Sequence, residues 1–487
     1  MSLAIDADRA GSMTTVTFDA AGLGDRSYLL SDGEQAVVVD PQRDLSPYLQ
    51  EALELGVDIT AVLETHIHND YVSGGLALSR ATGATYAIPA GEPVSFSHEC
   101  RALEDGEILL AGRLEVTAIA TAGHTAHHLA YRIEGPGGAT GGETVVCTGG
   151  SLLVNATGRT DLLGLDLAEA LARSQWHSVR RLLTTLPPGA RVLPTHGFGS
   201  FCSAAPAGGD TAETATIGHE LEQNPAALLD EEEFVKTLLA KLPPIPAYYR
   251  YMAPLNRQGQ AAFELGPVRE LDADDLDAAI GGAEWVVDLR PRRAFAARHR
   301  LGTVNLELGL NLTTYLGWLV PWESGLVLLA EDPVGIAEAR RLIARIGRDD
   351  LAGRALFATA VAATGDAGAD DARFGSYPVA DFSELAHAWS DRSAPGPLVF
   401  DVRHPHEWQE SHILGAHLVP LQELVGRQPE VPSGVPLWVH CGAGFRAAAA
   451  ASLLSGWGAS PIMIDDAWTN AVESGLPIVS GEDAASP

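Results

Sequence analysis

The 487-residue sequence predicts an α/β protein with a layered N-terminal domain followed by two similar domains that contain parallel sheets. Three observations support this prediction. Short β-rich runs alternate with helical stretches in the first 210 residues, one strand–helix pattern occurs twice in the second half, and 46% of the residues are apolar. At roughly 150 residues per domain, such a chain can bury several cores, which excludes a wholly disordered protein.

The composition is strongly acidic and excludes two classes of partner. The chain has 32 Lys and Arg against 63 Asp and Glu, which gives a formal net charge of −31. Such a surface repels phosphates and anionic lipids, so we expect neither nucleic acid nor a membrane as a partner. We see no secretory signal at the N-terminus and no apolar run long enough to span a bilayer.

The four cysteines are far apart and none forms a C-x-x-C pair. A disulfide scaffold or a thiolate zinc site is therefore not expected, and a reducing cytoplasm fits this usage. In that compartment a single cysteine can act as a nucleophile. The cysteines are Cys100, Cys147, Cys202 and Cys441.

Residues 1–210 form the first block, in which histidines follow the expected strands. The block has an expected helix at Leu167–Leu186 and strands at Ala36–Val39, Ala61–Glu64, Leu114–Ile119, Thr144–Cys147 and Arg191–Pro194. Neutral imidazoles in loops at strand ends indicate a metal site, and a nearby carboxylate could orient a ligand or serve a second ion. The candidate residues are His66, His68, His124, Asp70 and His196.

The rest of the chain divides into a helical extension and an internal repeat. Residues 211–260 are helical and interrupted by prolines, and they connect to domains expected at 261–365 and 372–487. In both domains a buried strand is followed by Asp-x-Arg, a polar helix, His and a second short strand. This alternation predicts βα units on a parallel sheet.

The second repeat contains a loop built for an anionic sulfur. Cys441 follows the expected strand Pro436–His440 and precedes a helix, so main-chain N–H groups and the helix dipole favour a thiolate there. Arg446 can close the loop or bind an oxyanion. The first repeat has Glu331 and Asp332 at this place, so we expect it to be inactive, with a structural or docking role. The loop residues between Cys441 and Arg446 are Gly442, Ala443, Gly444 and Phe445.

The first block resembles the metallo-β-lactamase superfamily in the run Thr65–His66–Ile67–His68–Asn69–Asp70 and in the later histidines. The resemblance implies an αββα sandwich. Thr148–Gly149 and Gly158–Asp161 look like the branch that contains glyoxalase II and the persulfide dioxygenases. In that branch, iron is held by the residues equivalent to His66, His124 and position 150, which is Gly150 here. The last histidine of the motif is replaced by Tyr71, and the implied ion is Fe(II), with zinc as the alternative.

The Cys441 loop and its upstream Asp401–Val402–Arg403 resemble the rhodanese family. This resemblance implies a persulfide on Cys441, formed from thiosulfate or another sulfane donor and passed to a low-molecular-weight thiol. The order of the domains is similar to that of bacterial persulfide dioxygenase–sulfurtransferase fusions. Fusion would hold two sulfur-handling sites at high effective concentration.

Three hypotheses for the first block remain open. It could oxidise low-molecular-weight persulfides, or it could be a thioester hydrolase in which one metal at His66, His68 and His124 activates water. It could also be a metal-free binding or oligomerising module for the rhodanese domain. The sulfur donor, the acceptor and the formation of a homo-oligomer are left open by the sequence.

Overall fold

The structure, a computed structural model, describes residues 4–8, 13–20, 22–137, 143–197, 199–204, 215–240, 242–282, 284–358, 373–390, 396–432 and 434–481. The chain forms two compact units, residues 1–264 with 341–348 and residues 265–340 with 349–487. The predicted boundary between 365 and 372 lies outside the described residues, and the four-part division stays a prediction. Among the helices described, none is long and apolar enough to cross a lipid bilayer.

The first unit is built on two large sheets. The seven-stranded sheet contains, in spatial order, β1 (Ala4–Asp8), β2 (Thr14–Ala20), β3 (Asp25–Ser31), β4 (Gln35–Val39), β5 (Asp58–Leu63), β6 (Thr85–Pro89) and β7 (Arg101–Leu103). The six-stranded sheet contains β15 (Ala215–Thr216), β14 (Arg191–Pro194), β11 (Thr144–Gly149), β10 (Leu129–Glu134), β9 (Leu114–Ala120) and β8 (Ile108–Ala111). A hairpin joins β12 (Leu152–Leu153) to β13 (Ala156–Thr157). All five strands expected in this block are present.

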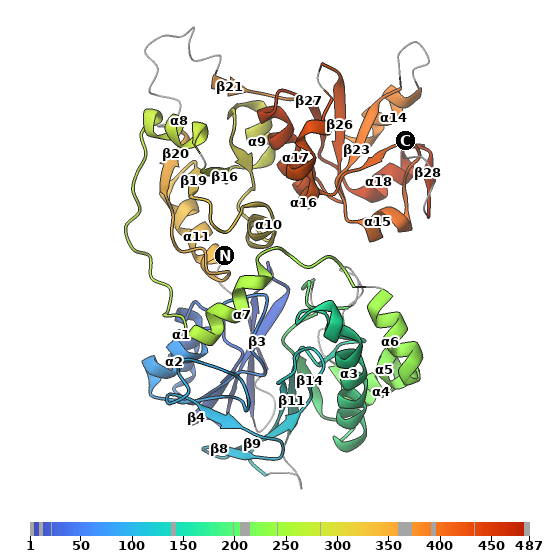
Figure 1. Cartoon of the computed structure of the whole chain (residues 1–487). Coiled ribbons are helices and arrows are strands. Elements are labelled where there is room, and N and C mark those ends of the chain that lie inside the picture. The colour runs from blue at the N-terminus through green and yellow to red at the C-terminus, as the bar shows by residue number, and fades with distance from the viewer. Residues whose placement is uncertain are drawn as a thin grey trace. The chain divides into compact units, whose positions relative to one another are not determined.

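The two sheets face each other across a shared core, and helices cover their outer faces (Figure 1). Tyr28 and Val37 of the first sheet share one buried cluster with Val116 and Tyr131 of the second. On the outside, α1 (Ser46–Leu55) and α2 (Gly75–Thr82) pack on the first sheet. The second sheet is covered by α3 (Leu165–Thr185), α4 (Ile217–Gln223), α5 (Pro225–Leu228) and α6 (Glu231–Ala240). This arrangement confirms the αββα sandwich, and α7 (Tyr249–Gln258) follows it.

The local sequence explains these elements. In β9, Leu114, Val116 and Ala118 are buried while the residues between them are partly exposed, which is the alternation of a strand with one face in the core. In α3, buried residues such as Ala172, Val179 and Leu182 recur at helical spacing, so one stripe of the helix lies on the sheet.

The second unit contains two sheets in which all the strands are parallel, as predicted. The first sheet contains β18 (Val304–Asn305), β16 (Trp285–Asp288), β19 (Leu326–Ala330) and β20 (Gly353–Leu356). The second contains β22 (Val379–Ala380), β27 (Ser460–Ile464), β26 (Pro436–His440), β23 (Leu398–Asp401) and β25 (His417–Leu418). We call residues 265–340 with 349–358 the first repeat and residues 373–481 the second repeat.

Helices and two short strand pairs complete the second unit. The first repeat has α8 (Ala273–Gly281), α9 (Arg292–Ala297), α10 (Leu312–Leu319) and the start of α11 (Pro333–Ala344). The second has α14 (Phe382–Ser390), α15 (Pro405–Glu410), α16 (Leu421–Leu424), the 3-10 helix Val425–Glu430, α17 (Phe445–Gly456) and α18 (Trp468–Glu473). The strand pairs are β17 (His299–Arg300) with β21 (Phe374–Gly375), and β24 (His412–Ile413) with β28 (Ile478–Val479).

Candidate functional site: a buried histidine cluster and a cysteine loop

Four histidines singled out in the sequence lie together in the first unit. His66 and His68 follow β5, His124 follows β9 and His196 follows β14, and all four are buried. The ring centroid of His66 lies 4.2 Å from that of His68, 4.9 Å from that of His124 and 5.3 Å from that of His196. Loops from both sheets therefore meet in one cluster of imidazoles.

His128 also belongs to this cluster, and the sequence analysis missed it. Its ring stacks on His66 with a centroid distance of 4.8 Å. Its Nε2 accepts a hydrogen bond from the Gly150 N–H at 3.1 Å, and its Nδ1 lies 2.8 Å from the Thr121 hydroxyl. Because both ring nitrogens are hydrogen-bonded, His128 supports the loop at Gly150 and has no lone pair left for an ion.

Two rings in the cluster are neutral. Burial lowers the pKa of His124 to about 3, and it holds the pKa of His66 well below the usual range. His124 Nδ1 lies 2.7 Å from the Arg159 carbonyl and donates to it, so Nε2 carries the lone pair. Within the described residues this buried Nε2 has no hydrogen-bond partner. A neutral imidazole nitrogen with no other partner can donate its lone pair to a metal ion.

His68 is held by hydrogen bonds at one nitrogen. Its Nε2 lies 3.1 Å from Glu64 and 3.0 Å from the Tyr71 hydroxyl. Burial alone would lower the pKa of His68, but the Asp40 and Glu64 carboxylates raise it to about 9. Its buried Nδ1 has no hydrogen-bond partner in the part of the chain that the structure describes. The carboxylates therefore favour positive charge at this ring, which a proton or a metal ion at Nδ1 can supply.

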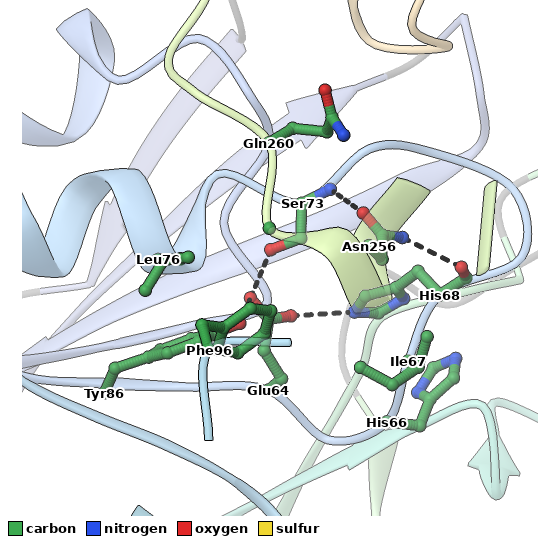
Figure 2. Close-up of a pocket in the computed structure, with 11 residues that line it drawn as sticks. Glu64, His66, Ile67, His68, Ser73, Leu76, Tyr86, Phe96, Asn256 and Gln260 are labelled. Carbon is green, nitrogen blue, oxygen red and sulfur yellow. Dashed lines mark hydrogen bonds and ion pairs between the residues drawn. The ribbon is translucent and has the colours of Figure 1, made fainter. Parts of the chain in front are cut away.

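A small pocket beside His68 shows how this ring is fixed (Figure 2). Glu64 lies between His68 and the Ser73 hydroxyl, which also hydrogen-bonds to it. Asn256 of α7 donates to the main-chain carbonyl of His68 at 2.9 Å and accepts from the Ser73 N–H at 2.8 Å. The helical extension thus contributes directly to the shape of the histidine loop, which its sequence did not indicate.

His196 is bound to two carboxylates. Its Nδ1 lies 2.8 Å from Asp25 and 3.1 Å from Asp70. Although burial acts in the opposite direction, Asp70 and Asp25 raise the pKa of His196 to about 10. The His196 Nε2 lies 3.4 Å from the Nε2 of His66. Asp70 therefore lies within reach of the cluster, beside Asp25, which the sequence analysis did not identify.

Position 150 offers no carboxylate, and the space for one is filled. A Cβ atom added to Gly150 would lie 2.2 Å from Cδ2 of His124, so the His124 ring occupies this place. Tyr71, which replaces the last histidine of the motif, donates to the Asp40 carbonyl at 3.1 Å. Without the carboxylate at position 150, the donors nearest this place are imidazole nitrogens.

The donor atoms of the cluster form candidate groups for a divalent ion. His66, His68 and His196 offer ligand atoms within 4.8 Å of one another, and His124 forms a second such group with His196 and Cys202. His196 belongs to both groups, whereas His124 belongs to only one of them. Nitrogen and sulfur donors suit zinc or iron, whereas magnesium and calcium prefer oxygen. Cys202, six residues after His196, was not among the expected ligands.

The second site is the loop at the end of β26. Cys441 is buried, and its sulfur accepts hydrogen bonds from the N–H groups of Gly444 at 3.1 Å and Ala447 at 3.4 Å. Gly444 has a φ of +90°, which glycine adopts without strain. The helix α17 begins at Phe445, so its N-terminal end faces the sulfur. These groups stabilise negative charge on sulfur.

Arg446 is anchored by a carboxylate. Its two terminal nitrogens donate to the two oxygens of Glu407 at 2.6 and 2.8 Å. Burial alone would raise the pKa of Glu407, but Arg446 lowers it to about 2. The pair is therefore charged on both sides near neutral pH and fixes the Arg446 side chain at the loop.

Residues of the first repeat lie at this loop, which the sequence did not predict. The Tyr315 ring of α10 lies 5.5 Å from the Phe445 ring, and the Trp318 ring stacks on His404 with a centroid distance of 5.2 Å. Burial raises the pKa of Tyr315 to about 12, so its hydroxyl keeps its proton. The first repeat therefore supplies an aromatic wall to the cysteine loop.

Comparisons with known proteins agree with both parts of the fold. Residues 23–196 match the metallo-beta-lactamase superfamily, and residues 384–472 match the rhodanese-like domain. The chain combines a metallo-beta-lactamase domain with a C-terminal rhodanese-like domain. A crystal structure described as a metallo-beta-lactamase from Staphylococcus aureus subsp. aureus COL is 25% identical, with a TM-score of 0.62, and the match covers 71% of this chain and 99% of that one.

Two sequence relatives each match less than half of this chain. The human protein named persulfide dioxygenase ETHE1, mitochondrial, is 29% identical over 47% of this chain and 82% of its own length. A protein of Cereibacter sphaeroides named hydroxyacylglutathione hydrolase is 30% identical over 34% of this chain and 58% of its own length. The chain is thus related both to a protein named as a persulfide dioxygenase and to a protein named as a hydroxyacylglutathione hydrolase.

Proposed function

We propose that this protein is a sulfane-sulfur enzyme whose second repeat transfers sulfur through a persulfide on Cys441. The observation that carries the proposal is the pair of N–H groups, from Gly444 and Ala447, directed at the sulfur atom. A thiolate is stabilised in this loop, and so is the terminal sulfur of a persulfide anion.

The transfer has two balanced steps. The Cys441 thiolate attacks the outer sulfur of the donor, a new S–S bond forms, and the donor leaves as sulfite from thiosulfate or as a thiolate from a persulfide. A thiolate acceptor then attacks the outer sulfur on Cys441, becomes a persulfide and releases the Cys441 thiolate. No net oxidant or reductant is consumed. The negative charge lies on sulfur in both states, and the loop N–H groups stabilise it.

Replacing the nucleophile tests this assignment. Cys441→Ser should abolish sulfur transfer from thiosulfate or glutathione persulfide to a thiol, to below about a thousandth of the wild-type rate, because serine is far less nucleophilic at this pH. Cys100→Ser is the matched control and should transfer at the wild-type rate, because Cys100 lies in the first unit. Transfer that persists in Cys441→Ser would refute the assignment.

We further propose that the histidine cluster binds one divalent ion and processes a low-molecular-weight persulfide. The observation that supports binding is the pair of buried nitrogens, His124 Nε2 and His68 Nδ1, without partners among the described residues. A bound ion would supply Lewis-acid or redox chemistry. The chain itself orients the ligands, through Arg159 at His124 and through Glu64 at His68. The relationship to the persulfide dioxygenase favours iron and oxygen as cosubstrate.

Thioester hydrolysis is the second candidate for the first domain. It is favoured by the nitrogen donors of His66, His68 and His196, which suit zinc, and by the related protein named hydroxyacylglutathione hydrolase. Elemental analysis of the purified protein separates the two candidates. Iron with oxygen uptake on glutathione persulfide supports the dioxygenase, zinc with cleavage of a hydroxyacylglutathione supports the hydrolase, and no metal refutes both.

The space at position 150 gives a sharper test of the metal centre. Gly150→Ala should lower the metal content, because its Cβ meets the His124 ring and displaces that ligand. Gly150→Asp adds the same Cβ together with a carboxylate ligand, so it should hold more iron than Gly150→Ala. Equal metal content in both variants and in the wild type would show that His124 is not a ligand.

We propose that the protein acts in the cytoplasm, on small sulfur compounds. The four cysteines are unpaired thiols, which suits the reducing cytoplasm. Low-molecular-weight thiols, their persulfides and thiosulfate are the partners that we propose.

A further inference from the structure

Arg292 of the first repeat contacts the Cys441 loop of the second. Its Nη2 lies 3.4 Å from the Ala443 carbonyl, and its Nε donates to Asp465 at 2.7 Å. We propose that Arg292 is a positioning residue for sulfur transfer at Cys441. The first repeat, which has no cysteine in its own loop, would thus contribute to the site of the second. The inference rests on the proposed sulfurtransferase function.

The argument depends on a single peptide group. The Ala443 carbonyl and the Gly444 N–H belong to the same planar trans peptide, so they point in opposite directions. Arg292 binds the carbonyl side of this peptide, and the Gly444 N–H donates to the Cys441 sulfur at 3.1 Å from the other side. Holding the carbonyl therefore aims the N–H at sulfur. A cation at the carbonyl also polarises the peptide and strengthens its N–H as a donor.

The packing around Gly444 shows that the loop is shaped to this contact. A Cβ atom at Gly444 would lie 2.5 Å from the Asp465 carboxylate and 3.0 Å from Arg292 Nε. Glycine is thus needed at this position because of the ion pair as well as because of its positive φ. The Arg292–Asp465 pair lies directly against the peptide that it orients.

Two carboxylates hold the Arg292 side chain in place. Glu307 of the first repeat forms an ion pair with it and also accepts from its main-chain N–H at 3.0 Å. Asp465 of the second repeat is nearly buried and binds both Arg292 and Arg293. Arg293 bonds to the other oxygen of Asp465, but 70% of its side chain is exposed, and among the described residues it makes no hydrogen bond to the loop.

Arg293 therefore offers a matched control in the full-length protein. Arg292→Gln should lower kcat of sulfur transfer about tenfold with KM little changed, because the N–H donor is misaimed while the substrate pocket stays intact. The pH at which iodoacetamide alkylates Cys441 at half its maximal rate should move higher, because the thiolate has lost part of its stabilisation. Arg293→Gln removes an ion pair to the same carboxylate and should change both quantities by less than about twofold.

Arg292→Lys keeps the charge and should recover part of the rate. Equal losses in Arg292→Gln and Arg293→Gln would overturn the proposal, since they would indicate a general effect of the contact between the repeats. An unchanged alkylation profile in Arg292→Gln would overturn it as well. If the wild-type protein transfers no sulfur, the proposed function fails, and the alkylation profiles still decide whether Arg292 positions the loop.

Discussion

The two repeats of the second unit share a frame but differ at the loop that follows β19 in the first and β26 in the second. In the first, Asp288 binds Arg290 at 2.7 Å, and in the second, Asp401 binds Arg403 at 2.7 Å. In both, a histidine four residues after an aromatic residue lies within 3.0 Å of its carbonyl and stacks on its ring; these are His299 on Phe295 and His412 on Trp408. These shared contacts therefore do not depend on a cysteine in the loop, since the first repeat has none there.

The difference lies where the central strand meets its helix. After β26, the Gly444 N–H donates to the Cys441 sulfur. After β19, the Gly335 N–H donates instead to the Asp332 carboxylate at 2.8 Å. A helix N-terminus attracts an anion in both repeats. In the first repeat a carboxylate of the protein supplies that anion, so the place of a sulfur anion is already taken.

The largest effect should come from breaking the shared frame. Asp288→Asn and Asp401→Asn each leave a buried arginine without its charged partner, so each should lower the free energy of unfolding by about 3–5 kcal/mol. Urea unfolding of the full-length protein, followed by tryptophan fluorescence, measures this. A loss in only one repeat would show that the two frames are not equivalent.

A smaller, pH-dependent effect on the free energy of unfolding should come from the ion pair at the Cys441 loop. Arg446 lowers the pKa of Glu407 to about 2 although burial opposes this, so the pair stabilises the fold fully above the ordinary pKa of 4.5 and loses this contribution as pH falls towards 2. The difference in unfolding free energy between the wild type and Glu407→Gln should therefore shrink on acidification from pH 6. A difference that grows on acidification would contradict the assigned pair.

The smallest effect is expected from giving the first repeat a cysteine. Glu331 directly follows β19, as Cys441 directly follows β26. Glu331→Cys in a Cys441→Ser background should show no sulfur transfer, because Pro333 lacks an N–H and Asp332 still occupies the helix N-terminus. Transfer above the background of Cys441→Ser would show that the cysteine alone decides activity.

The sequence predicted the layered α/β domain, the repeat and the position of Cys441, because these depend on local patterns. The αββα sandwich was implied by the family resemblance. The strand before Cys441 and the glycines after it lie within nine residues, so a loop that stabilises a thiolate can be recognised from the sequence alone. Arg292 carries no motif, and its partner Asp465 is 173 residues away in sequence. His128 lies beside His127 in a loop, and only its stacking on His66 shows that it belongs to the cluster. Contacts made in three dimensions account for what sequence analysis missed.

The central claim is that Cys441 carries the transferred sulfur. The most direct measurement is mass spectrometry of peptides from the full-length protein after incubation with thiosulfate or glutathione persulfide and removal of excess donor. We predict that the Cys441 peptide gains the mass of one sulfur atom, and that this mass is lost when a thiol acceptor is added. A Cys441 peptide without added sulfur, while sulfur is transferred at the normal rate, would contradict the account.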